Sequence, residues 1–197
     1  MENIVKIAYI GARDPLSEAF IMRMKKEGDD VYFLSKTSFH QTVSEVFRHR
    51  FFRISLSGDS FRKIITSIGP DYIVFAGGYY MDSVYREEEE EDVTLLTRTL
   101  QILPELQRTK FIFLSSTELY GNAGESVDED HEPAPCSERG IRFAVEERML
   151  EVYKKQYGLH VSVIRASQLY SDVAEEEGKD FLSRAYRDVI TMNTDQE

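Results

Sequence analysis

The stretch Lys110-Phe111-Ile112-Phe113-Leu114-Ser115-Ser116-Thr117-Glu118-Leu119-Tyr120-Gly121 changes abruptly from apolar to polar residues. Its apolar run, Phe111 to Leu114, is as short as a β-strand and has no polar face, which is typical of a strand covered on both sides. The hydroxyl and acidic residues that follow would lie at the carboxyl end of that strand. Because open parallel sheets bind ligands at this end, the stretch predicts a buried strand and a candidate site.

Apolar runs of strand length alternate with helical patterns along the rest of the chain. In the first such unit, Asp14-Pro15 provides a good N-cap and a favoured first helical residue, and Gly28 ends the helix. The alternation predicts one α/β domain over residues 1–197, a parallel sheet of six or seven strands ordered 3-2-1-4-5-6, and helices on both faces. The expected strands are 4–10, 31–34, 51–56, 72–76, 111–114 and 161–164, and the expected helices are 15–27, 39–47, 61–68, 93–107, 138–157 and 181–190.

The composition excludes several classes of protein and of site. The 197 residues suit a single domain, and the net charge of −11 argues against nucleic acid and anionic membranes as partners. No signal peptide is visible, and no apolar run approaches the ~20 residues of a membrane span. A single cysteine, Cys136, cannot form an internal disulfide, and the four histidines are scattered. We therefore expect a cytoplasmic protein without a metal site.

Several motifs resemble those of the extended short-chain dehydrogenase/reductase family, the NAD-dependent epimerases and dehydratases. There the fifth strand ends in Ser-Ser/Thr-x-x-x-Tyr-Gly, which is similar to Ser115 to Gly121 here. The segment Glu129 to Pro135 resembles the family's Glu-x-x-Pro-x-x-Pro loop. Val163-Ile164-Arg165 resembles its Leu-Arg-Pro segment, with Ala166 in place of the proline. The order and spacing of these pieces imply a Rossmann-like, doubly wound fold.

The resemblance implies a dinucleotide site at the first turn, where the family has Gly-x-x-Gly-x-x-Gly. Gly11 matches the first glycine, but Asp14 and Ser17 replace the other two. Asp14 adds bulk and negative charge where a pyrophosphate would lie, and as an N-cap it satisfies the same backbone donors. We therefore expect no cofactor, or NAD or NADP if the chain is active. The other cofactor positions are Ala12, Lys36, Asp59, Ala76 and Gly77. Of these, Lys36 could meet the 2′-phosphate of NADP or be a solvated turn residue.

The proton-transfer residues depart further from the family pattern. Gly140 and Glu147 align with the glycine and the glutamate of the family's Tyr-Gly-x-Ser-Lys-x-x-x-Glu run. Arg139 then falls on the tyrosine and Phe143 on the lysine. Arginine stays protonated near neutral pH, and phenylalanine has no charge with which to hold a nicotinamide ribose. The remaining candidate catalytic residues are Ser116, the hydroxyl that would polarise the substrate, Glu118 and Tyr120.

These departures leave three hypotheses open. The first is a catalytically degenerate family member that uses the fold as a binding or assembly module. The second is an active NAD(P)-dependent epimerase, dehydratase or reductase acting on a nucleotide sugar or a similar substrate. The third is a structural dimerisation domain without a ligand. The family's C-terminal substrate domain is largely absent from these residues, so the chain is either a piece of a longer protein or lacks a complete substrate site.

The helix expected at 93–107 has two apolar stripes, and one of them can cover the sheet. The second stripe, Leu95, Ile102 and Leu106, would need another partner. Family members often pair this helix and the next across a two-fold axis, so we expect a homodimer through helices 93–107 and 138–157. The acidic run 87–92 is interpreted as a solvated loop and a helix N-terminus, where carboxylates are favourable.

Overall fold

The computed structural model describes residues 4–11, 15–36, 50–55, 59–77, 89–122 and 126–167. They form a six-stranded parallel sheet ordered β3-β2-β1-β4-β5-β6, which confirms the expected fold class and strand order. The helices expected at 39–47 and 181–190 lie outside the described residues. The strands are β1 (Lys6–Ile10), β2 (Asp30–Ser35), β3 (Phe51–Arg53), β4 (Tyr72–Phe75), β5 (Lys110–Ser116) and β6 (Val161–Ala166). The helices are α1 (Pro15–Lys26), α2 (Ser60–Ile68), α3 (Glu89–Ile102) and α4 (Glu138–Tyr157), with 3-10 helices η2 (Leu103–Glu105) and η3 (Thr117–Tyr120).

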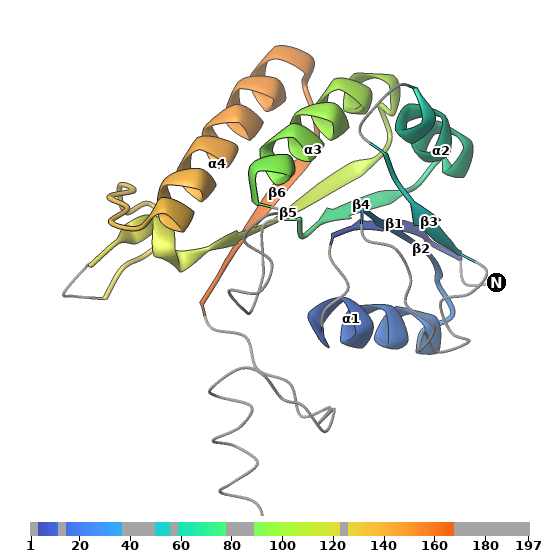
Figure 1. The fold of residues 1–197 in the computed structure, drawn as a ribbon, viewed down its shortest axis with the longest axis horizontal. Helices are drawn as coiled ribbons and strands as arrows, with labels where there is room; N and C mark the ends of the chain where they lie inside the picture. The colour runs from blue at the N-terminus through green and yellow to red at the C-terminus, as the bar shows by residue number, and fades with distance from the viewer. Residues whose placement is uncertain are drawn as a thin grey trace, which may run out of the picture.

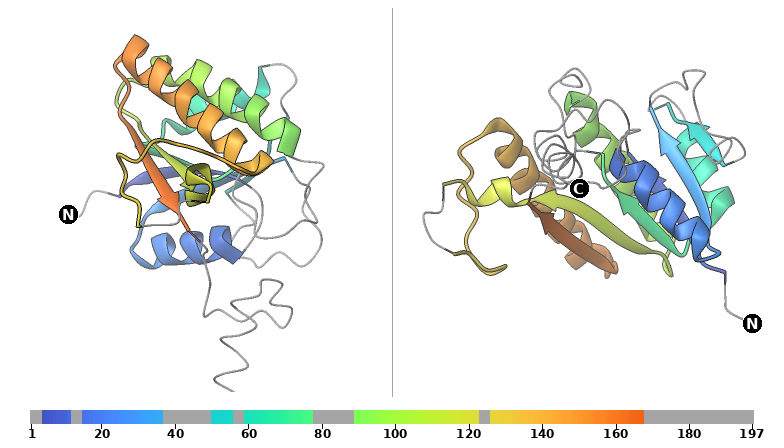
Figure 2. Two further views of the ribbon diagram at one scale, coloured as in Figure 1. Left: turned by 90° about the vertical axis from the view of Figure 1, so that its left-hand side faces the viewer. Right: turned by 90° about the horizontal axis from the view of Figure 1, so that it is seen from below.

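Helices cover both faces of the sheet, as Figure 1 shows: α2, α3 and α4 lie on one face and α1 lies on the other. Each face has its own apolar core. In the core under α1, the Tyr9 ring packs against those of Phe20 and Phe33, at centroid distances of 5.3 and 5.7 Å. On the other face, where Figure 2 shows α3 and α4 side by side, Phe75 and Phe113 are fully buried. The sheet is therefore covered on both sides, as the continuous apolar runs of its strands predict.

α3 begins at Glu89, within the acidic run, as expected of a helix N-terminus, but it ends five residues earlier than the apolar pattern predicts. Pro104 accounts for the early end, because proline lacks an N–H and clashes with the carbonyl four residues before it. The chain continues as η2, with the proline in its first turn. β3 is also shorter than expected, since its pairing with β2 ends at Arg53.

The second stripe of α3 is covered within the chain. Leu95 and Ile102 are 2% and 3% exposed, and Leu106 packs partly buried against the same core. The reasoning that these three residues need an external partner is therefore wrong. Exposed apolar side chains gather instead on α4, where Ile141, Val145 and Val152 are 52%, 50% and 49% exposed. Within the described part of the chain, no helix has the length and apolar character needed to cross a membrane.

Candidate functional site

The carboxyl ends of β1, β4 and β5 meet at one edge of the sheet. Ile10 pairs with Phe75 and Phe75 with Phe113, so the residues that follow these strands are neighbours. At Gly11 the backbones come so close that a Cβ would lie 3.4 Å from the Ala76 carbonyl group and 3.1 Å from the Tyr9 ring. A side chain here would be tight against the Tyr9 ring, so close packing favours a glycine, in agreement with the tight turn that the first glycine of the dinucleotide motif provides.

Two more positions assigned to a cofactor lie close to this turn. Ser17 in α1 is fully buried, at the motif position whose small residue lets the helix pack closely on the sheet. Gly77 follows Ala76 at the end of β4 and is also buried. Ala12 and Asp14 lie outside the described residues, so the expected conflict between Asp14 and a pyrophosphate stays a prediction.

The remaining two cofactor positions follow the flanking strands β2 and β3 in sequence. Lys36 directly follows β2 and is half-buried, and Asp59 immediately precedes α2. The Asp59 side chain is exposed and makes no capping hydrogen bond to the helix. The structure thus places both residues beyond strand ends, where the resemblance puts them.

Ser116 ends β5 and caps η3. Its backbone is extended, and its Oγ accepts a hydrogen bond of 3.2 Å from the N–H of Glu118. A serine in this conformation caps a helical turn because its oxygen replaces the missing carbonyl acceptor. Ser116 is only 4% exposed, and its hydroxyl keeps its own hydrogen as a donor.

Arg139 and Glu118 form an ion pair at the position that the sequence motif is expected to give to the family's tyrosine. The Arg139 Nε lies 3.5 Å from Glu118 Oε1, and both side chains are partly exposed. The other carboxylate oxygen of Glu118 accepts a hydrogen bond of 3.2 Å from the Ser137 hydroxyl. Ser137 is also the N-cap of α4, since its Oγ accepts from the N–H of Gly140 at 3.0 Å. Both oxygens of Glu118 therefore have partners from the start of α4.

Gly140 lets α4 pack directly onto η3. A Cβ at this position would lie 2.6 Å from the carbonyl oxygen of Glu118, a distance that real side chains do not adopt. The glycine that follows Arg139 is therefore fixed by packing. That Arg139 and Phe143 take the tyrosine and lysine positions stays a prediction.

Phe143 is part of the hydrophobic core. It is fully buried and packs edge-on against Phe113, with the ring centroids 6.4 Å apart. The guanidinium carbons of Arg142 and Arg139 lie 4.6 and 5.8 Å from its ring centroid. The position expected to match the family's lysine is thus an apolar core position with two guanidinium groups close to its ring.

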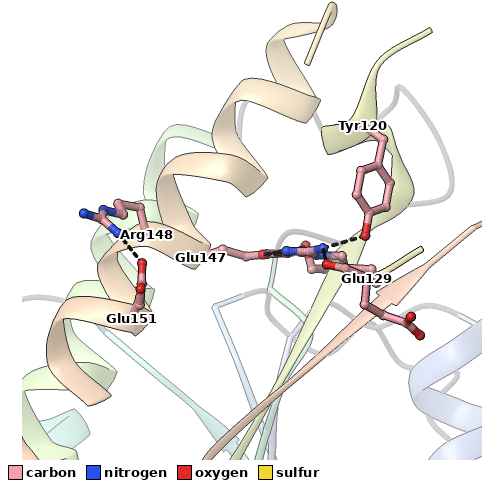
Figure 3. A network of polar contacts seen from close by, with 7 residues as sticks. Tyr120, Glu129, Glu147, Arg148 and Glu151 are labelled. Carbon is pink, nitrogen blue, oxygen red and sulfur yellow. Dashed lines mark hydrogen bonds and ion pairs between the residues drawn. The ribbon is translucent and has the colours of Figure 1, made fainter. Parts of the chain in front are cut away.

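A second polar network lies beside the first and is centred on Arg165 of β6. The Arg165 Nη2 and Nε donate to Glu147 Oε2 at 2.8 and 3.2 Å, and the Ser115 hydroxyl donates to Glu147 Oε1. Arg165 Nη1 donates to the Tyr120 hydroxyl and, at 2.8 Å, to the carbonyl oxygen of Glu129. Figure 3 shows Glu147 on α4 and Tyr120 reaching into this network from opposite sides. These contacts, chiefly those with Glu147, hold the pKa of Arg165 above its ordinary value.

Tyr120 is enclosed by this network. It is 6% exposed, the Arg165 guanidinium carbon lies 5.1 Å from its ring centroid, and the His131 ring meets it edge-on at 5.8 Å. Sequence reasoning gave no role to Glu147 and Arg165, although both lie in segments that resemble family motifs. Their opposite charges in two matched motifs were the signal that could have predicted the pair. Tyr120 thus belongs to the network around Arg165, whereas Ser116 and Glu118 belong to the network at the start of α4.

These two networks limit the chemistry available at the strand ends. Neither contains a tyrosine beside a lysine, and an arginine cannot exchange a proton near neutral pH. Among the residues that the structure describes, no group of three or more histidine, cysteine, aspartate or glutamate side chains could hold a metal ion. What the geometry provides is two sets of ion-paired and hydrogen-bonded side chains that contact one another.

Comparison with known proteins places these features in a family. The model of the "NAD dependent epimerase/dehydratase family" matches residues 10–195. A comparison with curated proteins gave no match.

Solved structures of this kind share the fold at low sequence identity. UDP-glucose 4-epimerase from Thermus thermophilus, in complex with NAD, is 20% identical with a TM-score of 0.71, and the match covers 88% of this chain and 58% of that one. dTDP-glucose 4,6-dehydratase from Bacillus anthracis, also with NAD, is 20% identical with a TM-score of 0.72, and the match covers 95% of this chain and 62% of that one. UDP-glucose 4-epimerase from Thermotoga maritima, with UDP-glucose, is 20% identical with a TM-score of 0.71, and the match covers 90% of this chain and 60% of that one. The chain therefore spans about three fifths of the length of these structures.

Proposed function

Because the chain belongs to the NAD dependent epimerase/dehydratase family, we propose that it keeps the family's nucleotide-binding fold without its hydride-transfer chemistry, and that it acts as a binding or assembly module. The observation that carries this proposal is the pair of positions 139 and 143. An ion pair with Glu118 fills the first, and a fully buried phenylalanine fills the second. Neither can replace a tyrosine whose proton is transferred and a lysine that holds the cofactor.

The loss extends to the first turn in the sequence. Asp14 replaces the glycine that would let a pyrophosphate approach the backbone, and it adds a like charge. Losing a charge-assisted hydrogen bond costs about 1.5–3 kcal/mol, and each ~1.4 kcal/mol weakens binding tenfold. Together, the changes at 14, 139 and 143 would move a micromolar cofactor site into the millimolar range. Similar structures with bound NAD make cofactor binding plausible for this fold. The proposed loss of cofactor binding in this chain therefore rests on the side chains at 14, 139 and 143.

Residue-level mapping tests this proposal. In ¹⁵N-labelled protein, we expect NAD, NADP or UDP-glucose at about 0.1 mM, well below a millimolar dissociation constant, to leave the amide resonances of Gly11, Ala76 and Gly77 essentially unmoved. An active enzyme predicts saturable shifts at these amides. It also predicts conversion of UDP-glucose or dTDP-glucose, which Ser116→Ala should then reduce. Saturable shifts together with such conversion would establish the enzyme hypothesis in place of ours.

We propose that assembly takes place through α4. Ile141, Val145 and Val152 form an exposed apolar stripe along it, and the half-buried Met149 continues this stripe. Acidic Glu138 lies in the first turn of α4, and Lys154 and Lys155 lie in the last. Two antiparallel copies would therefore bring opposite charges together at both ends. This favours a homodimer through α4, with α3 beside it, over a monomer.

Light scattering at tens of micromolar tests the dimer. We expect the mass of a dimer for the native chain, since an isologous interface of this kind should bury more than ~1,000 Å² in total. Val145→Glu places a charge in the centre of the stripe and should give a monomer. Met22→Glu is the matched control, because Met22 is equally exposed but lies on α1, on the other face of the sheet. A monomeric native chain would contradict the proposal.

A further inference from the structure

Glu146 on α4 is a buried carboxyl group that neither polar network uses. Its side chain is 0% exposed, although its neighbours in the buried stripe of the helix, Phe143 and Leu150, are apolar. Glutamate is almost never fully buried unless it is paired and well hydrogen-bonded. The contacts of this group therefore decide whether it can hold a charge.

The Arg142–Glu146 contact is a weak one for a buried charge. One Arg142 nitrogen, Nη1, is shared between both carboxylate oxygens, at 3.3 and 3.4 Å. Good charge-assisted hydrogen bonds measure about 2.7–2.9 Å, and a buried carboxylate needs several of them to offset its lost hydration. Arg142 is itself placed over the Phe143 ring, at 4.6 Å from the centroid. The guanidinium thus interacts with the ring as well as with the carboxylate.

Other charged groups near α4 are engaged elsewhere. Glu147 pairs with Arg165 from β6, and this pair also takes up the hydroxyls of Ser115 on β5 and Tyr120 on η3. Arg98 of α3 is exposed. The buried polar group on α3, Thr99, donates its hydroxyl hydrogen to the carbonyl of Leu95 in its own helix at 2.8 Å. Arg142 is the charged partner that the structure provides for Glu146.

We propose that Glu146 is an internal proton-binding site, protonated in the folded protein at mildly acidic pH and ionised against Arg142 as the pH rises through neutrality. The neutral acid needs no ion pair and suits its buried surroundings, so α4 packs most stably in that state. Ionisation leaves a carboxylate with one long, shared contact. The result is a device that weakens the packing of α4 as the pH rises.

The direction of the effect follows from the two states. Burial raises the pKa of Glu146 from 4.5 to about 7, and the Arg142 charge opposes this rise. The folded chain then holds this proton roughly 300-fold more tightly than the unfolded chain does. The resulting stabilisation is complete below the unfolded pKa of 4.5. It is lost as the pH rises through the folded value near 7, so the unfolding equilibrium constant should increase by roughly 300-fold over this range.

Carbon-13 NMR of the glutamate carboxyl groups is the direct test. We expect one carboxyl resonance to titrate near pH 7 in the native chain and to be missing in Glu146→Gln. Arg142→Met should move this titration to higher pH, because the guanidinium favours the charged form. If every glutamate carboxyl titrates below about pH 5, the inference is wrong. This measurement on the native chain decides the matter even if a variant fails to fold.

Equilibrium unfolding gives the second readout. The native chain should lose stability between pH 5 and pH 8, and Glu146→Gln should remove most of this dependence. Glu151→Gln is the matched control on the same helix. The exposed Glu151 lies among Arg148 and Lys155, whose contacts, chiefly the Lys155 hydrogen bond, lower its pKa. The Glu151→Gln variant should therefore keep the native dependence of stability on pH between pH 5 and pH 8. A Glu146→Gln variant with the native slope would overturn the inference.

Discussion

Phe143→Lys should lower the free energy of unfolding by about 4 kcal/mol or more, because truncating a buried aromatic side chain costs about 3–5 kcal/mol and the amine adds a desolvated charge. The substitution introduces the lysine that the motif comparison expects active family members to have at this position. In this chain, however, the side chain is fully buried against Phe113, and the guanidinium groups of Arg139 and Arg142 flank it. A positive charge would therefore meet both an apolar core and two like charges. Chemical denaturation followed by circular dichroism measures the loss.

Phe143→Leu is the control for this experiment, because it keeps the position apolar and should cost about 1.5 kcal/mol or less. A loss of 4 kcal/mol is a large part of the 5–15 kcal/mol that stabilises a typical domain. We therefore expect the lysine variant to be largely unfolded under conditions where the leucine variant is folded. A lysine variant as stable as the leucine variant would mean that the side chain at 143 can reach solvent or a cofactor, against the core position described here.

Arg165→Met should lower the free energy of unfolding by about 2–4 kcal/mol, since it leaves a partly buried carboxylate without its cation. Glu147 loses its bidentate partner, while the Tyr120 hydroxyl and the Glu129 carbonyl each lose a donor. The last contact ties the loop before α4 to β6. We therefore expect faster amide hydrogen exchange in residues 126–137 as well as a lower unfolding midpoint.

The control is the second ion pair drawn in Figure 3, Arg148 with Glu151, which lies on the exposed side of the same helix. Arg148→Met makes the same change in side chain there and should alter stability little, because exposed pairs contribute little. The double variant Glu147→Leu/Arg165→Met should be more stable than the sum of the two single effects predicts, since it leaves no unpaired charge. If Arg165→Met and Arg148→Met have equal, small effects, the Arg165 network does not hold the site together.

The strand order and most elements followed from hydrophobic patterns, because strands buried on both faces have continuous apolar runs. Helix ends were less certain, as the early end of α3 before Pro104 shows. The expectation that the second stripe of α3 needs an external partner was wrong, for a reason that the hydrophobic pattern alone cannot reveal. Two stripes show that a helix has two neighbours, but not whether the second belongs to the same chain. Here Leu95 and Ile102 are buried within it.

The site was partly predictable. Matching motifs located Ser116, Glu118 and Tyr120 at the end of β5, where the structure also has them. The ion pair between Glu118 and Arg139 was not predicted, because it joins residues far apart in sequence through the packing of α4 on η3. The same holds for Arg165, whose guanidinium brings together β6, η3 and α4. Such contacts depend on the relative placement of elements, and the period of a sequence pattern contains no information about this.

We propose that the fold no longer holds a nicotinamide cofactor, which calorimetric titration with NAD, NADH, NADP and NADPH can test. Asp14→Gly and Arg139→Tyr, singly and together, are the comparison variants, since Phe143→Lys should not fold well enough to be used. A gain of affinity in these variants would place the loss at the substituted side chains. For the native chain we predict no binding tighter than about 1 mM, equivalent to about −4.1 kcal/mol. A dissociation constant below about 100 μM, near −5.5 kcal/mol, for any of the four dinucleotides would contradict the claim.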